Sequence, residues 1–292
     1  MTVFEKVTVT PNRIESLYRY FMQNEKKGVT RDAYVAATSP SILQRRENAG
    51  SSMAGSVFDE AVTMAILEET QPNKTYQLTP QLLNKSISLH GYLEQSLLVP
   101  QWANQRGQER FPQASAWFLI RDCRQPVSFS ATPRELPERV FGENSRGETN
   151  NQRLQAFYYW ARHMGFAWWL GGNKTGTVIM ADPTEILRRH LSRLLILKRR
   201  VLLRDLMGEL AQQLPIFEGG EVRDELEDQE NIARKSLELS GTTSLALLRL
   251  EQDGVIALES LSDAPTMSFL ISPRSRVVTH VTLQQERNAD DL

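Results

Sequence analysis

Apolar side chains recur at helical spacing close to the N-terminus, at Ile14, Leu17 and Phe21. The pair Thr10-Pro11 stands directly before them, and a threonine followed by proline is typical of the first turn of a helix. We therefore expect a helix that starts at this pair and ends near residue 28.

Two further helices and a short strand are expected before residue 84. Thr30 can cap the start of a helix over 30–37, and Pro40 ends it, because proline cannot continue a helix. Apolar positions over 51–67 again follow helical spacing, and residues 76–78 have the composition of a strand. Three helices followed by a short hairpin are the order of a winged helix, a variant of the helix-turn-helix.

The same order returns in the middle of the chain. Helices are expected around 116–120, at 132–142 and at 150–164, and strands at 166–170 and 177–180. The glycine-rich sequence GGNKTG joins the two strands and predicts a tight turn. We interpret this hairpin as the wing of a second unit.

A third unit follows, with an acidic helix inserted in it. The expected helices are 184–200, 201–214, 221–238 and 242–252, and the expected strands of a closing hairpin are 255–259 and 267–271. The three units share an order of elements and little literal sequence, which suits separate small domains better than a solenoid.

The predicted fold class is therefore mainly α with small β-hairpins. It comprises three tandem winged-helix (helix-turn-helix) domains at 1–84, 85–183 and 184–292.

Charge is distributed unevenly along the chain. Residues 1–84 carry 9 basic and 9 acidic side chains, residues 85–205 carry 18 and 10, and residues 206–292 carry 7 and 16. The three parts are thus neutral, +8 and −9, although the whole chain has a net charge of only −1. Such asymmetry predicts that the middle faces a polyanion and that the acidic end faces a protein or stays solvated.

The composition is typical of a globular protein. With 40% apolar and 24% charged residues, the chain can form a sizeable core. Basic residues interrupt the longest apolar stretch, 191–203, so no membrane span is expected. The N-terminal residues lack the pattern of a secretion signal, and the single Cys123 excludes an internal disulfide. We expect a cytoplasmic protein.

Candidate contacts with double-stranded DNA gather in the central unit. Arginine, asparagine and glutamine side chains distinguish base edges in the major groove, and such residues open the helix predicted at 150–164. The candidates there are Asn150, Asn151, Gln152, Arg153 and Gln155. Arg146 before the helix and Lys174 at the hairpin tip are expected to contact phosphates. The alternative is a capped helix with a solvated polar face.

A dense basic run follows the central unit. It comprises Arg188, Arg189, Arg193, Lys198, Arg199, Arg200 and Arg204. These cations could neutralise phosphates, in which case DNA binding would weaken steeply with salt. They could equally pair with carboxylates of the acidic part of the same chain. Weaker candidates in the first unit are Arg45, Arg46, Ser51 and Ser52.

We expect no catalytic activity, metal or cofactor. The four histidines are scattered without the spacing of a zinc site. GGNKTGT lacks the spacing of a phosphate-binding loop, and the chain has no nucleophile-elbow or dinucleotide motif. The acidic stretch at 221–230 is interpreted as a solvated face.

An aromatic cluster admits two interpretations. Its members are Tyr158, Tyr159, Trp160, Trp168 and Trp169. They could stack on bases of a single strand, but periodicity favours core packing that buries Tyr158 and at least one of the paired tryptophans.

The order of the three units, with PNRIESLYRYF in the first and LQAFYYWARHMGFAWWL in the centre, resembles the DpdG-like winged-helix accessory proteins of bacterial phage-defence clusters. The resemblance extends over nearly the whole chain and rests on architecture rather than on a signature motif. It implies an association with the restriction of foreign DNA.

Three functions are therefore compatible with the sequence. The first is a non-enzymatic module of a multi-protein defence system that binds double-stranded DNA. The second is an adaptor whose tandem winged helices hold a partner subunit, as in chromosome-organising complexes, and the −9 part favours it. The third, a transcriptional regulator, needs a dimer or a ligand pocket that the sequence does not indicate.

Overall fold

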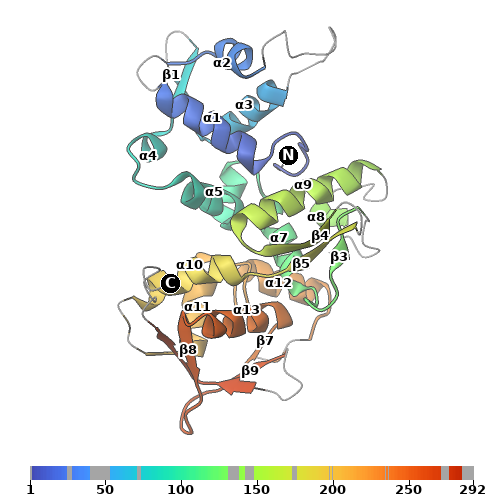
Figure 1. Cartoon of the computed structure of the whole chain (residues 1–292), viewed down its shortest axis with the longest axis vertical. Coiled ribbons are helices and arrows are strands. Elements are labelled where there is room, and N and C mark those ends of the chain that lie inside the picture. The colour runs from blue at the N-terminus through green and yellow to red at the C-terminus, as the bar shows by residue number, and fades with distance from the viewer. Residues whose placement is uncertain are drawn as a thin grey trace. The chain divides into compact units, whose positions relative to one another are not determined.

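A computed structural model describes most of the chain. The residues that it describes are 2–24, 28–39, 53–70, 74–130, 138–141, 148–172, 176–196, 198, 200–233, 235, 237–270 and 276–284, with the side chains of 138–139 and 148–150 left out. Helices predominate in these residues and the sheets are small, mostly antiparallel and two- or three-stranded (Figure 1). The predicted class, mainly α with small hairpins, is confirmed at this level.

The chain forms two compact units. Unit 1 contains residues 1–111 and 135–160, and unit 2 contains residues 112–134 and 161–292. The division at 1–84, 85–183 and 184–292 groups the chain by element order instead, and it stays a prediction.

The first set of elements lies in unit 1. It consists of α1 (Pro11–Gln23), α2 (Arg31–Thr38), α3 (Met53–Thr63), β1 (Leu67–Thr70) and β2 (Thr75–Leu78). Thr30 caps α2 as predicted, since its Oγ1 accepts a hydrogen bond from the Ala33 amide at 3.2 Å. Leu67 lies in β1, so the prediction of a helix through 67 was wrong. The helix ends at Thr63, and Ala65 takes a φ of +52° that no helix allows.

Aromatic rings connect these elements. Phe58 of α3 meets Tyr76 of β2 edge to face, with 4.9 Å between ring centroids, and also lies 5.7 Å from Tyr34 of α2. Phe21 of α1 completes the cluster, 6.2 Å from Phe58. Helical spacing of apolar residues in α1 thus produces a buried stripe, and hydrophobic burial holds the three helices against the hairpin.

The short helices α4 (Pro80–Leu83), α5 (Leu89–Leu98) and α6 (Pro100–Gln105) follow, and they lead to α7 (Arg110–Ile120). A second aromatic cluster in unit 1 joins the N-terminal segment to later helices. Phe4 lies 5.3 Å from Phe141 of α8 (Glu138–Phe141) and 6.1 Å from Phe157 of α9 (Glu148–Met164).

The central hairpin lies in unit 2 and matches the prediction. Strand β4 (Ala167–Gly172) pairs antiparallel with β5 (Gly176–Ala181), and β3 (Val127–Ser128) pairs with the other edge of β5. The predicted burial along α9 is also found, since Leu154, Phe157, Tyr158 and Ala161 are all buried.

The last part of unit 2 is a layer of helices on small sheets. The helices are α10 (Thr184–Leu195), α11 (Leu203–Gln213), α12 (Glu221–Gln229) and α13 (Gly241–Gln252). The strands are β6 (Val201–Leu202), β7 (Glu238–Leu239), β8 (Ile256–Glu259), β9 (Met267–Phe269), β10 (Arg276–Val278) and β11 (His280–Leu283). Thr242 at the start of α13 donates to the Leu119 carbonyl at 2.7 Å and so connects this layer to α7.

Several predictions for this part were wrong. The helix predicted at 184–200 ends at Leu195, and residues 201–202, predicted to begin the next helix, form β6. The acidic helix ends at Gln229 rather than at 238, and Asn231 then takes a φ of +52°. Strand β8 does not pair with β9. It pairs with β11, where Leu258 lies opposite Val281, while β9 pairs with β10 and β7. A partner more than 20 residues away cannot be inferred from alternation within one strand.

One order of pairing occurs three times. A short segment after a helix pairs with the second strand of a later hairpin or strand pair: Val29 bridges Tyr76 of β2, β3 pairs with β5, and β6 pairs with β11. The resulting three-stranded orders are β3-β5-β4 and β6-β11-β8, and the Val29 bridge gives the same order beside β2 and β1.

We expect Gly165→Ala to lower the free energy of unfolding by about 1 kcal/mol or more. Gly165 ends α9 with a φ of +86°, and an added Cβ would lie 3.1 Å from the Ile186 amide nitrogen. Urea unfolding measures the effect. Gly208→Ala is the control, because Gly208 lies inside α11 with nothing within 4 Å of an added Cβ. That exposed helical site should gain about 0.5–1 kcal/mol. A gain at Gly165 as well would contradict the expectation.

Candidate nucleic-acid interface

The N-terminal half of α9 presents part of the predicted contact set. Gln152 is exposed, whereas Asn151, Arg153 and Gln155 are half-buried. Nη1 of Arg153 donates to the Phe141 carbonyl at 3.1 Å, so this guanidinium is partly engaged inside unit 1. Gln152 is therefore the member of the set whose described side chain is most accessible.

Several candidates fall outside the described part of the chain. These are Arg45, Arg46, Ser51, Ser52, Arg146, Lys174 and Arg199, together with the side chain of Asn150. Their predicted contacts stay predictions.

The basic run is largely paired with carboxylates of the same chain. Arg188 lies 2.6 Å from Asp253, and Lys198 lies 2.5 Å from Glu209. Arg200 lies 2.9 Å from Glu259. Asp253, Glu209 and Glu259 all belong to the acidic part at 206–292. Of the two alternatives that the sequence left open, pairing within the chain is therefore present for these three cations.

The electrostatic surroundings of Arg188 favour its charged form. Burial acts to lower its pKa, but the hydrogen bond to Asp253 and the charge of Glu185 outweigh burial, so that the pKa is raised above its ordinary value. Exposed ion pairs of this kind contribute only about 0–1 kcal/mol each. A phosphate group could therefore replace such a carboxylate at small cost.

The remaining cations of the run behave differently from one another. Nη2 of Arg189 donates to the Met164 carbonyl at 2.6 Å and so satisfies an acceptor at the C-terminal end of α9. Arg204 pairs with its neighbour Asp205, and Arg193 is exposed on α10. The described cations thus do not form one uninterrupted free surface.

The aromatic cluster is divided between core and surface. Tyr158 and Trp160 are buried, as core packing predicts, and Nε1 of Trp160 donates to the Val9 carbonyl at 3.0 Å. Trp168 on β4 is 50% exposed, Trp169 is half-buried and Tyr159 is exposed. The prediction that at least one of the paired tryptophans is buried was therefore wrong. Helical and strand periodicity could not decide which tryptophan of the pair 168–169 faces outward, because both faces of this sheet carry apolar residues.

Trp168 borders a cavity of about 300 Å³ within unit 2. Residues of α9, β4, α10 and α13, and of the segments that adjoin α9, α10 and α13, line it: Arg162, Gly165, Ala167, Trp168, Asp182, Thr184, Glu185, Arg188, Arg249 and Asp253. Arg249 is ion-paired with Asp182, and the Arg162 guanidinium carbon lies 4.9 Å from the centre of the Trp169 ring.

A buried charge network lies elsewhere in unit 2. Arg223 of α12 is almost fully buried, and its Nε lies 2.5 Å from Glu227, while Nη2 lies 3.7 Å from Glu218. The stretch at 221–230 is therefore not wholly a solvated face, and that prediction was wrong for Arg223 and Glu227. One arginine within an acidic run was the signal for it, since a buried charge requires partners of opposite sign.

Glu218 also receives hydrogen bonds from the start of α13. The Ser240 amide donates to its carboxylate at 3.0 Å, and Thr243 Oγ1 lies 2.9 Å from it. Burial acts to raise the pKa of Glu218, but the Arg223 charge and the Ser240 hydrogen bond outweigh burial and hold the pKa below its ordinary value. A carboxylate at a helix N-terminus is further favoured by the helix dipole.

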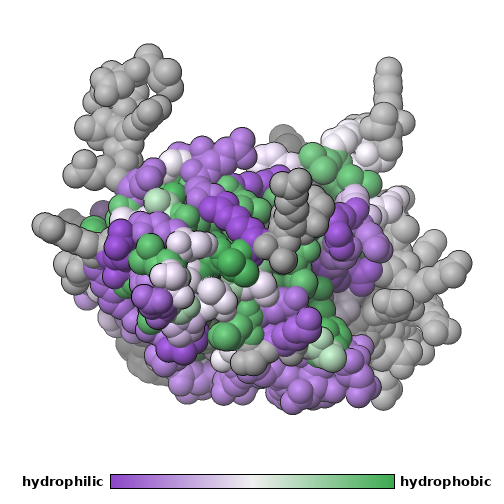
Figure 2. All heavy atoms as spheres, turned by 90° about the horizontal axis from the view of Figure 1, so that it is seen from below, coloured by the Kyte–Doolittle hydropathy of each residue, from purple (hydrophilic) through white to green (hydrophobic). Residues whose placement is uncertain are grey.

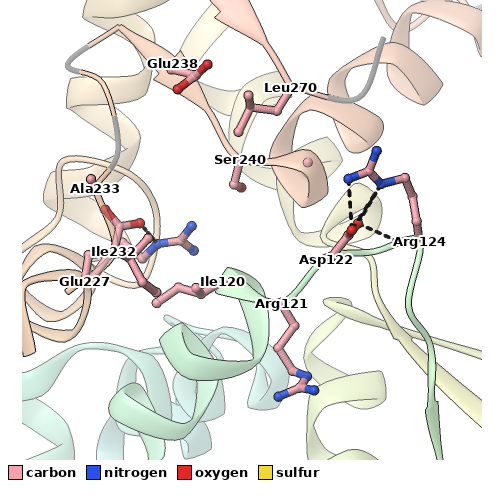
Figure 3. A pocket seen from close by; sticks show the side chains of 12 residues that line it. Ile120, Arg121, Asp122, Arg124, Glu227, Ile232, Ala233, Glu238, Ser240 and Leu270 are labelled. Carbon is pink, nitrogen blue, oxygen red and sulfur yellow. Dashed lines mark hydrogen bonds and ion pairs between the residues drawn. The ribbon is translucent and has the colours of Figure 1, made fainter. Parts of the chain in front are cut away.

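Beside this network is a cavity of about 230 Å³ (Figure 3). Asp122 and Arg124, which pair at 2.8 Å, lie on one side of it, and Glu227 and Ile232 lie on the other. Its three arginines are matched by three carboxylates, Asp122, Glu227 and Glu238.

Among the described residues, no helix has both the length and the apolar composition needed to cross a membrane. Within the same residues, no group of histidine, cysteine, aspartate and glutamate side chains is arranged to hold a metal ion.

We expect Glu218→Gln to destabilise the protein by about 1–3 kcal/mol near pH 7, since it removes a buried, hydrogen-bonded charge. A glutamate in the unfolded chain has a pKa of about 4.3, above that of folded Glu218. The stabilisation by Glu218 is therefore complete above this range and is lost as the pH falls through the folded pKa. Urea unfolding at pH 7 and pH 3 should show a smaller difference between wild type and variant at pH 3.

The control is Glu221→Gln, on an exposed residue in the first turn of α12. This variant should stay within about 0.5 kcal/mol of wild type at both pH values. A Glu218→Gln effect that is equal at both pH values would show that Glu218 does not titrate as its surroundings indicate.

A family of known proteins is similar to this chain over most of its length. The model of the family described as DpdG-like matches residues 1–264. No curated protein and no solved structure matches the chain. Because the matched residues make up most of the 292, the chain belongs to the DpdG-like family.

Proposed function

We propose that this chain is a non-enzymatic, cytoplasmic component of a bacterial phage-defence system, which associates with double-stranded DNA through winged-helix domains. Family membership supports the link to defence through the resemblance described above. The threefold recurrence of one strand-pairing order supports three tandem winged helices. In helix-turn-helix proteins, a helix enters the major groove and its N-terminal residues contact base edges.

The observation that carries the DNA proposal is the exposed Gln152 in the N-terminal half of α9, which precedes the hairpin β4-β5 in the chain. Gln152 is exposed there, while Leu154 and Phe157 on the opposite side of the helix are buried. A glutamine amide can form two hydrogen bonds with adenine in the major groove. The positive end of the helix dipole also lies at this terminus and favours nearby phosphates.

The basic run contributes less than its charge suggests. Arg188, Lys198 and Arg200 must exchange a carboxylate for a phosphate before they contribute. Arg193 is exposed on α10, and it has no ion-pair partner among the described residues. Binding is therefore weak, strongly dependent on salt and more sensitive to Arg193 than to the paired cations.

Fluorescence anisotropy with a labelled duplex at 50 and 200 mM salt tests this proposal. Gln152→Ala should weaken the binding of a preferred sequence by about 1–3 kcal/mol. Arg193→Gln should reduce the logarithmic salt slope by about one, because one phosphate contact is lost. Arg19→Gln is the control, because Arg19 is an exposed arginine of α1 in unit 1. Absent or salt-insensitive binding would rule out the DNA proposal.

A second candidate function is that of an adaptor for a partner protein. The acidic part at 206–292 exposes several large apolar side chains: Ile232, Leu237, Leu261, Leu270 and Val277. One face of the molecule shows apolar patches between hydrophilic side chains (Figure 2). Apolar residues surrounded by polar ones are typical of protein-binding surfaces.

The adaptor is tested by co-purification with products of neighbouring genes. Deletion of residues 206–292 is unsuitable, because it removes β8 and β11 and leaves β6 without its partner. The double variant Leu237→Asp and Leu270→Asp should instead abolish the complex, because charge is costly in a desolvated interface. Val62→Asp, on an exposed apolar residue of α3, is the control. A complex that survives the double variant argues against this surface.

A further inference from the structure

The cavity beside Trp168 combines an aromatic ring with arginines that have different partners. Trp168 comes from β4, Arg162 from the last turn of α9, Arg188 from α10 and Arg249 from α13. All four belong to unit 2. The cavity of about 300 Å³ is at the lower end of the range for small-molecule sites.

Trp168 is half exposed, so this tryptophan is not part of the buried core. Strand alternation places Trp168 and Leu170 on one face of β4, opposite Met180 and Val178 of β5. Arg249 is held in position by Asp182, and its guanidinium carbon lies 6.0 Å from the centre of the Trp168 ring. The ring is thus oriented by the protein and still accessible, as a stacking platform requires.

The charges around the ring are not equivalent. Arg249 pairs with Asp182, and Arg188 is shared between Glu185 and Asp253. Arg162 is exposed and lies over the Trp169 ring, and no carboxylate among the described residues pairs with it. Arg162 is therefore the cation of this cavity that can accept an anionic group without breaking an ion pair.

Hydrogen-bond acceptors also line this cavity. The side chains of Glu185 and Asp253 are 59% and 48% exposed, and each meets Arg188 through one described contact. Each carboxylate has two oxygens and can accept further hydrogen bonds. Carboxylates accept from the exocyclic amino groups of bases.

We propose that this cavity binds a nucleobase together with its phosphate. The base stacks on Trp168, its amino group donates to Glu185 or Asp253, and the phosphate pairs with Arg162. This site differs from the duplex contact proposed at α9. A base can reach a tryptophan face only when it is free, single-stranded or extruded from the DNA duplex. The shared chemistry is a base with one phosphate, supplied by a free nucleotide or by a strand.

The test uses the full chain with AMP, adenosine, CMP and a labelled single-stranded hexanucleotide as probes. Isothermal titration follows the nucleotides and anisotropy follows the strand. Trp168→Ala should weaken binding of the preferred probe by about 5- to 150-fold, the range expected for loss of one stacked base. Trp168→Phe should retain most of the affinity, because it keeps a ring. Arg162→Gln should remove the preference for AMP over adenosine.

Controls separate binding from folding and from the DNA proposal. Thermal unfolding of Trp168→Phe and Arg162→Gln should match wild type, and Arg19→Gln should bind every probe as wild type does. Binding of mononucleotides indicates a free-nucleotide site, and binding of the strand alone indicates a site for a base within a single strand. Both results support the cavity if Trp168→Ala weakens the binding by the expected factor. Absence of binding to all probes, or equal binding by Trp168→Ala, overturns the inference. If the wild-type chain binds nucleotides but does not bind a duplex, only the DNA proposal is contradicted.

Discussion

Neutralisation of the basic run by the acidic part of the chain determines how much of the positive charge of unit 2 is available to other molecules. The pairs Arg188 with Asp253, Lys198 with Glu209 and Arg200 with Glu259 connect residues 11 to 65 positions apart. Each pair is weak by itself, yet together they explain how so many cations can lie close along one segment. The same pairs reduce the positive charge available to a nucleic acid.

The buried network around Arg223 has a different role. A surface pair tolerates loss of a partner, whereas the carboxylates of Glu218 and Glu227 are nearly inaccessible to water and share the positive charge of one guanidinium. Nη1 of Arg223 has no hydrogen-bond partner among the described residues, so the network is not completely satisfied. Its geometry connects α12 to the first turn of α13 and thereby fixes where the helix before β8 begins.

Local patterns predicted the parts of the fold that local physics determines. The apolar spacing of α1, the Thr30 cap of α2 and the hairpin β4-β5 all depend on residues within a few positions of one another. The pairing of β8 with β11 and the burial of Arg223 depend on partners distant in sequence or on the third dimension. For the candidate site, the sequence indicated Gln152 and the basic run. It also indicated carboxylates of the acidic part as alternative partners of that run. Whether Trp168 or Trp169 faces solvent depends on packing that alternation alone does not specify.

The pairing of β6 with β11 has a consequence for biosynthesis. Residues 201–202 leave the ribosome about 80 positions before the strand at His280–Leu283 that completes their sheet. During translation, β6 therefore lacks its neighbour, and an open strand edge is a site of misassociation. Its two-residue length limits that exposure, so the shortness of β6 protects the nascent polypeptide until the last strand emerges.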